Sequence, residues 1–183
     1  MENVKVRELM VPMDQFPRIS SKASLHEALS TLEKVQEAFL AEGAQQRILL
    51  VENTSGKVIG KISPIDIFRG LETKYTEVNY EENLRKFGLT YVWDSMQEDY
   101  NLWHSPFEDL CRKAGQVHVK DFVNVPSNGQ QVNTENKLSK CFHLFVINRH
   151  DALFVKEGED FVGMLLFADV FSKVSQTIKT CTF

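Results

Sequence analysis

The chain has 183 residues, of which 43% are hydrophobic and 25% charged, a composition typical of a folded globular protein rather than a disordered one. This length suits one compact domain or two small ones. A net charge of -4 leaves no broad cationic surface for phosphate backbones, so duplex nucleic acid is not an expected partner. The longest nearly apolar run, residues 161–171, is too short to span a bilayer, and the chain opens without a charged-then-apolar leader. We therefore expect a cytoplasmic protein with no membrane partner.

The first predicted elements are a strand, a helix and a hairpin. A short strand is expected at residues 16–19. A helix starting at Leu25 follows, because Ser24 and Glu27 have the S-x-x-E spacing of a capping box. Apolar residues then recur near a 3.6 period as far as Phe39, which gives this helix one apolar stripe. Residues 47–52 and 57–62 are predicted strands, joined by turn-forming residues between them.

Residues 73–116 come next, and they are too many and too patterned for a flexible linker. Ser105, Pro106 and Glu108 provide a cap, a proline in the first turn and an acid at the third position, which together predict the start of a helix. All four tyrosines and both tryptophans lie in this stretch. Such large amphipathic rings suit an interface, and a helical hairpin packed on its own domain is the alternative.

The C-terminal part of the chain repeats the N-terminal part. Val-Arg-Glu-Leu-Met at residues 6–10 returns as Val-Lys-Asp-Phe-Val at 119–123, and Leu25 returns as Leu138, in both cases 113 positions later. Asp66 returns as Asp169, 103 positions later. We therefore predict a helix within residues 137–149, strands at 152–156 and 161–166, and a last helix at 170–175. The sequence divides into a first repeat (1–71), a helical aromatic-rich insert (72–116) and a second repeat (117–183).

Motifs for catalysis and metal binding are missing from the sequence. The five histidines are scattered without H-E-x-x-H spacing and the three cysteines form no C-x-x-C pair, so we expect reduced thiols and no metal site. The sequence contains no G-x-S-x-G elbow, no G-x-x-x-x-G-K-[ST] phosphate loop and no G-x-G-x-x-G turn. We expect no catalytic residues, no required cofactor and no enzyme activity.

The repeated pattern resembles a CBS domain. The likeness rests on residues 6–12, on the helix after Ser24 and on Gly-Lys-Ile-Ser-Pro-Ile-Asp at 60–66; it covers about residues 4–71 and, more weakly, 117–174. It implies an α/β (α+β) fold of two βαββα repeats packed as a pseudo-symmetric pair, with the helical insert between them. Such pairs, called Bateman modules, usually bind AMP, ADP, ATP or related adenosyl ligands in the clefts between repeats.

In that family a G-h-x-[ST]-x-x-D segment faces the ligand. Gly60, Ser63 and Asp66 match this segment, and Pro64 follows the serine. A carboxylate at a helix start can accept both ribose hydroxyls, while a hydroxyl and free N–H groups hold phosphate. A glycine allows the backbone to come close to a ligand. The alternative is that the small polar residues at this junction only cap the helix.

Further site residues follow from the same resemblance. It places Pro17, Arg18 and Ile19 near an adenine ring, with Ile19 as an apolar wall. Arg47, at the start of the hairpin, is either a phosphate contact or an ordinary surface residue.

The second repeat has a degenerate form of the motif. Leu166 stands where the hydroxyl is expected, and Asp169 either faces a ligand or only caps the last helix. We therefore expect one competent site per chain. The predicted function is a ligand sensor in which an adenine nucleotide shifts the repeats or two paired chains, and an unknown effector protein responds. The family commonly forms flat homodimers through its helices, so a homodimer is expected. The alternative is a CBS-fold interaction scaffold that binds no ligand.

Overall fold

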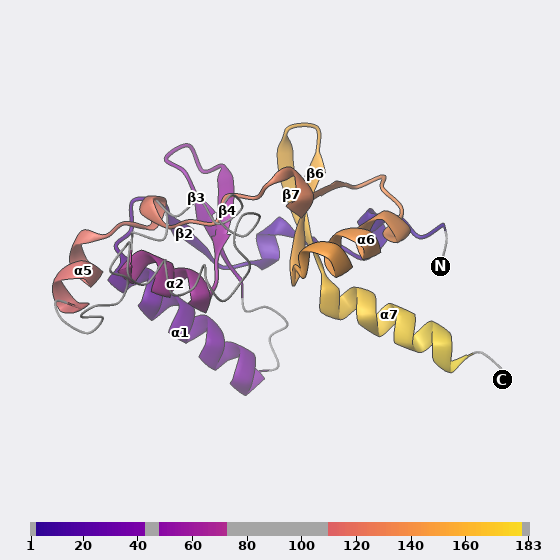
Figure 1. The fold of residues 1–183 in the computed structure, drawn as a ribbon, viewed down its shortest axis with the longest axis horizontal. Coiled ribbons are helices and arrows are strands. Elements are labelled where there is room, and N and C mark those ends of the chain that lie inside the picture. Colours follow the sequence, from indigo (N-terminus) through magenta and orange to yellow (C-terminus); the bar gives the residue numbers. More distant parts are fainter. Residues whose placement is uncertain (1–2, 43–47, 73–109, 181–183) are drawn as a thin grey trace, which may run out of the picture. The chain divides into compact units, whose positions relative to one another are not determined.

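The computed structural model describes residues 3–42, 48–72 and 110–180. These residues form two compact units (Figure 1). The central unit comprises Pro17–Asn124, and the terminal unit combines Met1–Phe16 with Val125–Phe183. The units therefore do not follow the division of the sequence into repeats, because each unit includes a short segment that belongs, by sequence, to the other repeat.

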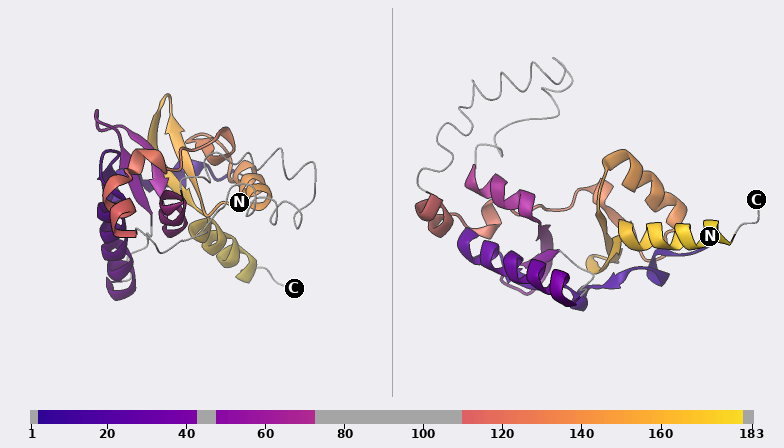
Figure 2. Two further views of the ribbon diagram at one scale, coloured as in Figure 1. Left: turned by 60° about the vertical axis from the view of Figure 1, so that its left-hand side comes forward. Right: turned by 90° about the horizontal axis from the view of Figure 1, so that it is seen from below.

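The central unit is built on a three-stranded sheet in the order β2-β3-β4, with β2 parallel and β4 antiparallel to β3. Its strands are β2 (Arg18–Ser20), β3 (Leu49–Glu52) and β4 (Val58–Ile62). The helices of this unit are α1 (Leu25–Glu42), α2 (Pro64–Leu71) and α5 (Leu110–Gln116). Helices α1 and α2 lie side by side, and α5 packs against both (Figure 1; Figure 2). The apolar core between helices and sheet includes Leu25, Leu49 and Ile62.

Local sequence signals start and close these elements. The N–H and Oγ of Ser24 donate to the Glu27 carboxylate at 2.7 and 2.9 Å, and the Glu27 N–H donates back to Ser24 Oγ at 3.2 Å. The predicted capping box is therefore confirmed, and its hydrogen bonds lower the pKa of Glu27. In the turn between β3 and β4, Asn53 Oδ1 accepts hydrogen bonds from the N–H groups of Ser55 and Lys57. Gly56 closes this turn with a φ of 77°.

The terminal unit is built on a four-stranded sheet in the order β1-β7-β6-β5. Its strands are β1 (Val11–Pro12), β5 (Gln131–Asn133), β6 (Ala152–Glu157) and β7 (Asp160–Leu166). Helices α6 (Leu138–Asn148) and α7 (Phe167–Lys179) supply Leu138, Cys141 and Val170 to its core. Burial raises the pKa of the Cys141 thiol to about 11, so this cysteine is an unreactive packing residue at neutral pH.

Each unit is completed by an arm from the other repeat. The first arm (residues 4–10) packs in the terminal unit, and the second arm (residues 117–123) packs in the central unit. Val6 and Val119 occupy equivalent places in the two arms, and both are 0% exposed. Leu25 N–H donates to the carbonyl of Val117 at 2.8 Å, and Leu138 N–H donates to the carbonyl of Val4 at 3.1 Å. The two repeats therefore exchange their arms through the same backbone contacts.

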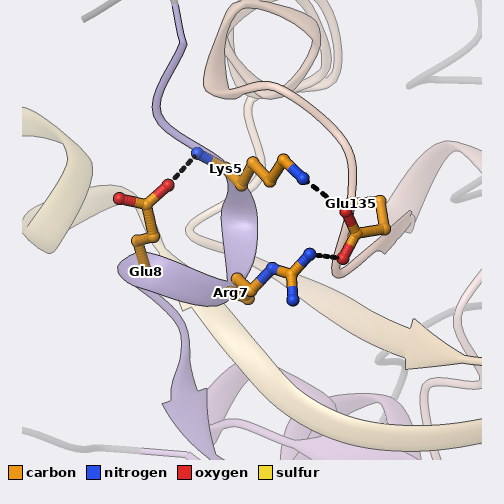
Figure 3. Close-up of polar contacts among 4 residues, drawn as sticks. All are labelled: Lys5, Arg7, Glu8 and Glu135. Carbon is orange, nitrogen blue, oxygen red and sulfur yellow. Dashed lines mark hydrogen bonds and ion pairs between the residues drawn. The ribbon is translucent and has the colours of Figure 1, made fainter.

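Charged side chains around the two arms differ. Glu135 accepts a hydrogen bond from Lys5 Nζ at 2.6 Å and another from Arg7, which ties the first arm to the terminal unit (Figure 3). The position equivalent to Glu135 in the first repeat holds Lys22, and the second arm carries Lys120 at the position of Arg7. The charge attraction that supports the first arm thus has no counterpart among these equivalent positions of the central unit.

The predicted strands and helices are confirmed within the described residues, with shifts of one to three residues at most ends. The last helix is the exception. It was expected at residues 170–175, whereas α7 begins at Phe167, directly after β7, and continues to Lys179 because Phe171, Val174 and Ile178 extend its apolar stripe. The predictions for residues 73–109, including the aromatic interface, lie outside the described residues. Within the described part of the chain, the helices are too short or too polar to cross a bilayer.

Candidate ligand-binding site

The junction between β4 and α2 brings Ser63 and Asp66 into direct contact. Ser63 is extended, with φ -123° and ψ 169°, and it precedes the first residue of α2. Its N–H and its Oγ both donate to Asp66 Oδ2, at 2.8 and 2.7 Å. Three-residue spacing at a helix start places an acid over the free N–H of the capping residue, which explains why these two side chains meet.

Asp66 is almost completely buried, with 2% of its surface exposed. Its second oxygen accepts a long hydrogen bond from Arg69 at 3.4 Å. In this structure Asp66 therefore acts as a helix cap, which is the alternative that the sequence left open. A carboxylate has about four acceptor positions, and these three hydrogen bonds use most of them.

Gly60 permits a close approach, and the group that approaches it is part of the chain itself. A β-carbon at this position would lie 2.5 Å from the carbonyl oxygen of Asn124, the residue after the second arm. Gly163 shows the same relation in the terminal unit, where a β-carbon would lie 2.7 Å from the carbonyl oxygen of Val11. Both glycines thus make room for the chain that follows an arm.

The other residues predicted from the sequence fall into two separate hollows of the central unit. Arg18 and Ile19 line a hollow of about 470 Å³ beside the β3–β4 turn, where Arg18 is ion-paired with Glu52. Pro64 lies at the start of α2 and lines an apolar groove of about 530 Å³ between α1 and α2. Arg47 lies outside the described residues. The structure therefore groups Ser63 with Asp66 and Arg18 with Ile19, and it places Pro64 in the helical groove.

The equivalent junction of the second repeat has lost these polar contacts. Leu166 replaces the hydroxyl residue and is buried in the sheet. Asp169 is the third residue of α7, and among the described residues its carboxylate makes no hydrogen bond or ion pair, so it does not cap the helix as the alternative prediction held. Burial raises the pKa of Asp169, because its charge is partly desolvated without a compensating partner.

One polar residue near the junction was not singled out from the sequence. Lys61 on β4 is only 6% exposed. Successive side chains of a strand point to opposite faces of the sheet. The next residue, Ile62, belongs to the core of the central unit, so the side chain of Lys61 lies on the other face. Two sequence signals could have identified it. Lys61 lies two residues before Ser63, and the equivalent position of the second repeat, 103 residues later, holds Met164.

The fold can now be compared with known structures. CBSX2, solved in complex with AMP, has a TM-score of 0.57 at 14% identity, with 95% of this chain and 98% of that chain covered. A CBS domain-containing protein of unknown function from Bacillus anthracis gives a TM-score of 0.60 at 14% identity, covering 96% of this chain and 95% of that chain. A CBS domain pair/ACT domain protein from Thermotoga maritima gives 0.52 at 15% identity, covering 96% and 99%.

These likenesses establish the fold of this chain as that of a CBS-domain pair. The prediction of an α/β fold with two CBS repeats is thereby confirmed. The sequence matches no family model and no curated protein. Within the described residues, no cluster of three or more histidine, cysteine or acidic side chains is placed to hold a metal ion.

Proposed function

We propose that this protein is a regulatory module without catalytic activity of its own, which binds an adenine nucleotide, AMP, ADP or ATP, at residues 60–66 of the first repeat. The observation that carries the proposal is the direct contact of Ser63 and Asp66 at the β4–α2 junction of a CBS-pair fold. One protein with this fold, CBSX2, was crystallised with AMP, which supports the choice of ligand class.

The chemistry of the junction suits a sugar and a phosphate. The junction lies at the start of α2, where the positive end of the helix dipole favours an anion. A ribose can replace Ser63 as the donor to Asp66, and this releases the Ser63 hydroxyl for a phosphate oxygen. Nucleotide binding therefore exchanges an internal cap for contacts with the ligand, and this difference in contacts is what shifts the conformation.

The proposal includes a homodimer and an effector protein that responds to the bound state. Support for the dimer comes from apolar side chains exposed on the helices, with Phe68 of α2 at 55% and Phe171 of α7 at 62% exposure. Patches of this kind mark contact surfaces. A second copy of the chain is the occupant that we propose for them, and sedimentation velocity at increasing concentration measures its association.

Titration calorimetry with AMP, ADP, ATP and S-adenosylmethionine tests the nucleotide site. We expect binding of at least one of the nucleotides, and a decrease in affinity of about 10- to 100-fold in Asp66→Asn, because a charge-assisted hydrogen bond to ribose is lost. Asp169→Asn is the matched control in the second repeat and should change the affinity less than about 3-fold. An unchanged affinity in Asp66→Asn would contradict the proposed site.

A second candidate function is an interaction scaffold with the CBS fold and no ligand. The observation that favours it is the apolar groove between α1 and α2, lined by Leu32, Ile67 and Leu71 among others. Apolar grooves between helices are common docking sites for other proteins. The absence of heat and of a thermal shift with all four adenosyl compounds would favour this function over nucleotide binding.

A further inference from the structure

The acid of the candidate site is held by two partners, and the second repeat has neither of them. Ser63 donates to Asp66 Oδ2 at 2.7 and 2.8 Å, and Arg69 donates to Asp66 Oδ1 at 3.4 Å. In the second repeat, 103 positions later, Leu166 and Ser172 stand in place of these two partners. A helix follows the strand in both repeats, so the fold itself requires neither partner.

Arg69 is the weaker of the two partners. It lies on α2 one turn after Asp66, whereas the cap at the start of this helix is formed by Ser63 and Asp66. Its hydrogen bond is long, because charge-assisted bonds from nitrogen to a carboxylate usually measure about 2.7–2.9 Å. The Arg69 side chain is 45% exposed, so water and salt weaken the ion pair further. Arg69 is therefore the partner that a ligand can displace more easily.

The position of Arg69 controls access to one oxygen of Asp66. The carboxylate is buried, and a guanidinium that bonds to Oδ1 and is itself half exposed lies between that oxygen and the solvent. A ribose has two neighbouring hydroxyl groups, and a carboxylate binds both best when each of its oxygens accepts one of them. In the proposed function one hydroxyl replaces Ser63 at Oδ2. The group that the other hydroxyl meets at Oδ1 is Arg69.

We propose that Arg69 is a displaceable cover of Asp66, which competes with the ribose for Oδ1 and thereby lowers the affinity of the first repeat for adenosyl ligands. This inference rests on the proposed nucleotide site and deepens it. Arg69 is a positioning residue, because it acts on the ligand through Asp66. Binding of a ribose releases the guanidinium, so the charge presented by α2 differs between the free and the bound state.

Arg69→Ser tests the inference, because serine is the residue that the second repeat holds at the equivalent position. The probe is adenosine, which carries the ribose but no phosphate that an arginine could attract. Its affinity is measured by titration calorimetry, directly or by displacement of AMP. We expect this affinity to rise about 2- to 5-fold, the range of a partly exposed ion pair. Lys173→Ser is the matched control, since it removes an exposed cation from α7 and should leave the affinity unchanged.

Salt distinguishes competition by Arg69 from a general change in structure. Adenosine is uncharged at neutral pH, so added salt acts on its binding mainly by screening the pair of Arg69 and Asp66. The affinity of the unmodified chain for adenosine should therefore increase between about 0.05 and 0.5 M sodium chloride. The affinity of Arg69→Ser should change less over the same range, because the competing charge is gone.

The outcomes separate this inference from the proposed function. If the unmodified chain binds AMP and Arg69→Ser binds adenosine no more tightly than the unmodified chain does, Arg69 is not a competitor and the nucleotide site stands. If the unmodified chain binds none of AMP, ADP, ATP and adenosine, both proposals are wrong. Arg69→Gln covers the case in which the serine variant fails to fold. It removes the charge and keeps a long polar side chain, and an unchanged adenosine affinity in this variant would overturn the inference.

Discussion

The first and second repeats build the same framework from positions that they share. Val6 and Val119 anchor the two arms, and Gly60 and Gly163 leave room for the chain that follows them. The members of each pair are similarly buried, and the two glycines face carbonyl oxygens of equivalent residues, although much of the sequence has diverged. Positions that are alike in both repeats therefore report what the fold requires.

The repeats differ where polar side chains meet the β4–α2 junction and its counterpart. Ser63 and Lys61 of the first repeat correspond to Leu166 and Met164 of the second. The fold tolerates either set, since both junctions lead from a strand into a helix at the same point. Positions that differ in this way are the candidates for function, and the polar side chains at them belong to the first repeat.

The largest effect is expected from a change at the shared glycines. Gly60→Ala brings a β-carbon against the backbone carbonyl of Asn124, and Gly163→Ala brings one against that of Val11. Neither carbonyl can move without displacing the chain that follows the arm. We expect each substitution to lower the free energy of unfolding by about 1–3 kcal/mol, to a similar extent in both repeats. Thermal unfolding measures this, at roughly 2–4 °C per kcal/mol for a chain of this size.

Gly115→Ala on α5 provides the control. A β-carbon there meets nothing within 4 Å, so the change should leave the unfolding temperature equal or slightly higher. If only Gly60→Ala lowered the free energy of unfolding and Gly163→Ala did not, the comparison would fail, because the two arms would not be held equivalently.

A smaller effect is expected at the charged positions around the arms. Glu135→Gln removes two exposed ion pairs, with Lys5 and Arg7, and should lower the free energy of unfolding by about 0.2–1 kcal/mol. Lys22→Glu introduces the acid at the equivalent place beside the second arm and should raise stability by a similar or smaller amount. Chemical denaturation of both variants gives the two values.

Salt separates these electrostatic effects from changes in packing. The changes in the free energy of unfolding caused by Glu135→Gln and by Lys22→Glu should both become smaller in about 1 M sodium chloride, because salt screens exposed ion pairs. A loss in Glu135→Gln that persists at high salt would mean that Glu135 supports the arm by packing rather than by charge.

The smallest effect concerns Asp169 and depends on pH. Burial raises the pKa of this carboxyl in the folded chain, so the folded state binds its proton more tightly than the unfolded state. The resulting stabilisation is complete below the ordinary pKa of an aspartate and is lost as the pH rises through the raised value. Asp169→Asn should therefore increase stability slightly at pH 7 and have no effect near about pH 3. Equal unfolding temperatures of the unmodified chain and the Asp169→Asn variant at pH 7 would contradict this expected gain in stability.

The sequence predicted those parts of the fold that depend on local patterns. The S-x-x-E cap at Ser24, the turn at Asn53 and the 113-residue offset of Leu25 and Leu138 each reflect a short-range rule, and each is confirmed. The exchange of arms was not predicted, because Val6 carries the same local signal whether it packs on its own repeat or on the other. Only the long-range contacts decide between these two possibilities.

The candidate site was also predicted only where it depends on short-range rules. The contact of Ser63 with Asp66 follows from three-residue spacing at a helix start. The separation of Pro64 from Arg18 and Ile19 depends on which side of α2 and of the sheet each residue faces, and a linear pattern does not contain this. Lys61 was overlooked because a lysine between a glycine and an isoleucine is usually exposed.

The exchange of arms has a consequence for biosynthesis. The central unit is complete in sequence once Asn124 has left the ribosome, so it can fold while the remainder is being made. The first arm is synthesised before the central unit, yet its docking place around Glu135 and Leu138 emerges after the whole central unit. The terminal unit is therefore completed after the central unit, and the first arm must stay available until translation reaches β5, β6 and β7.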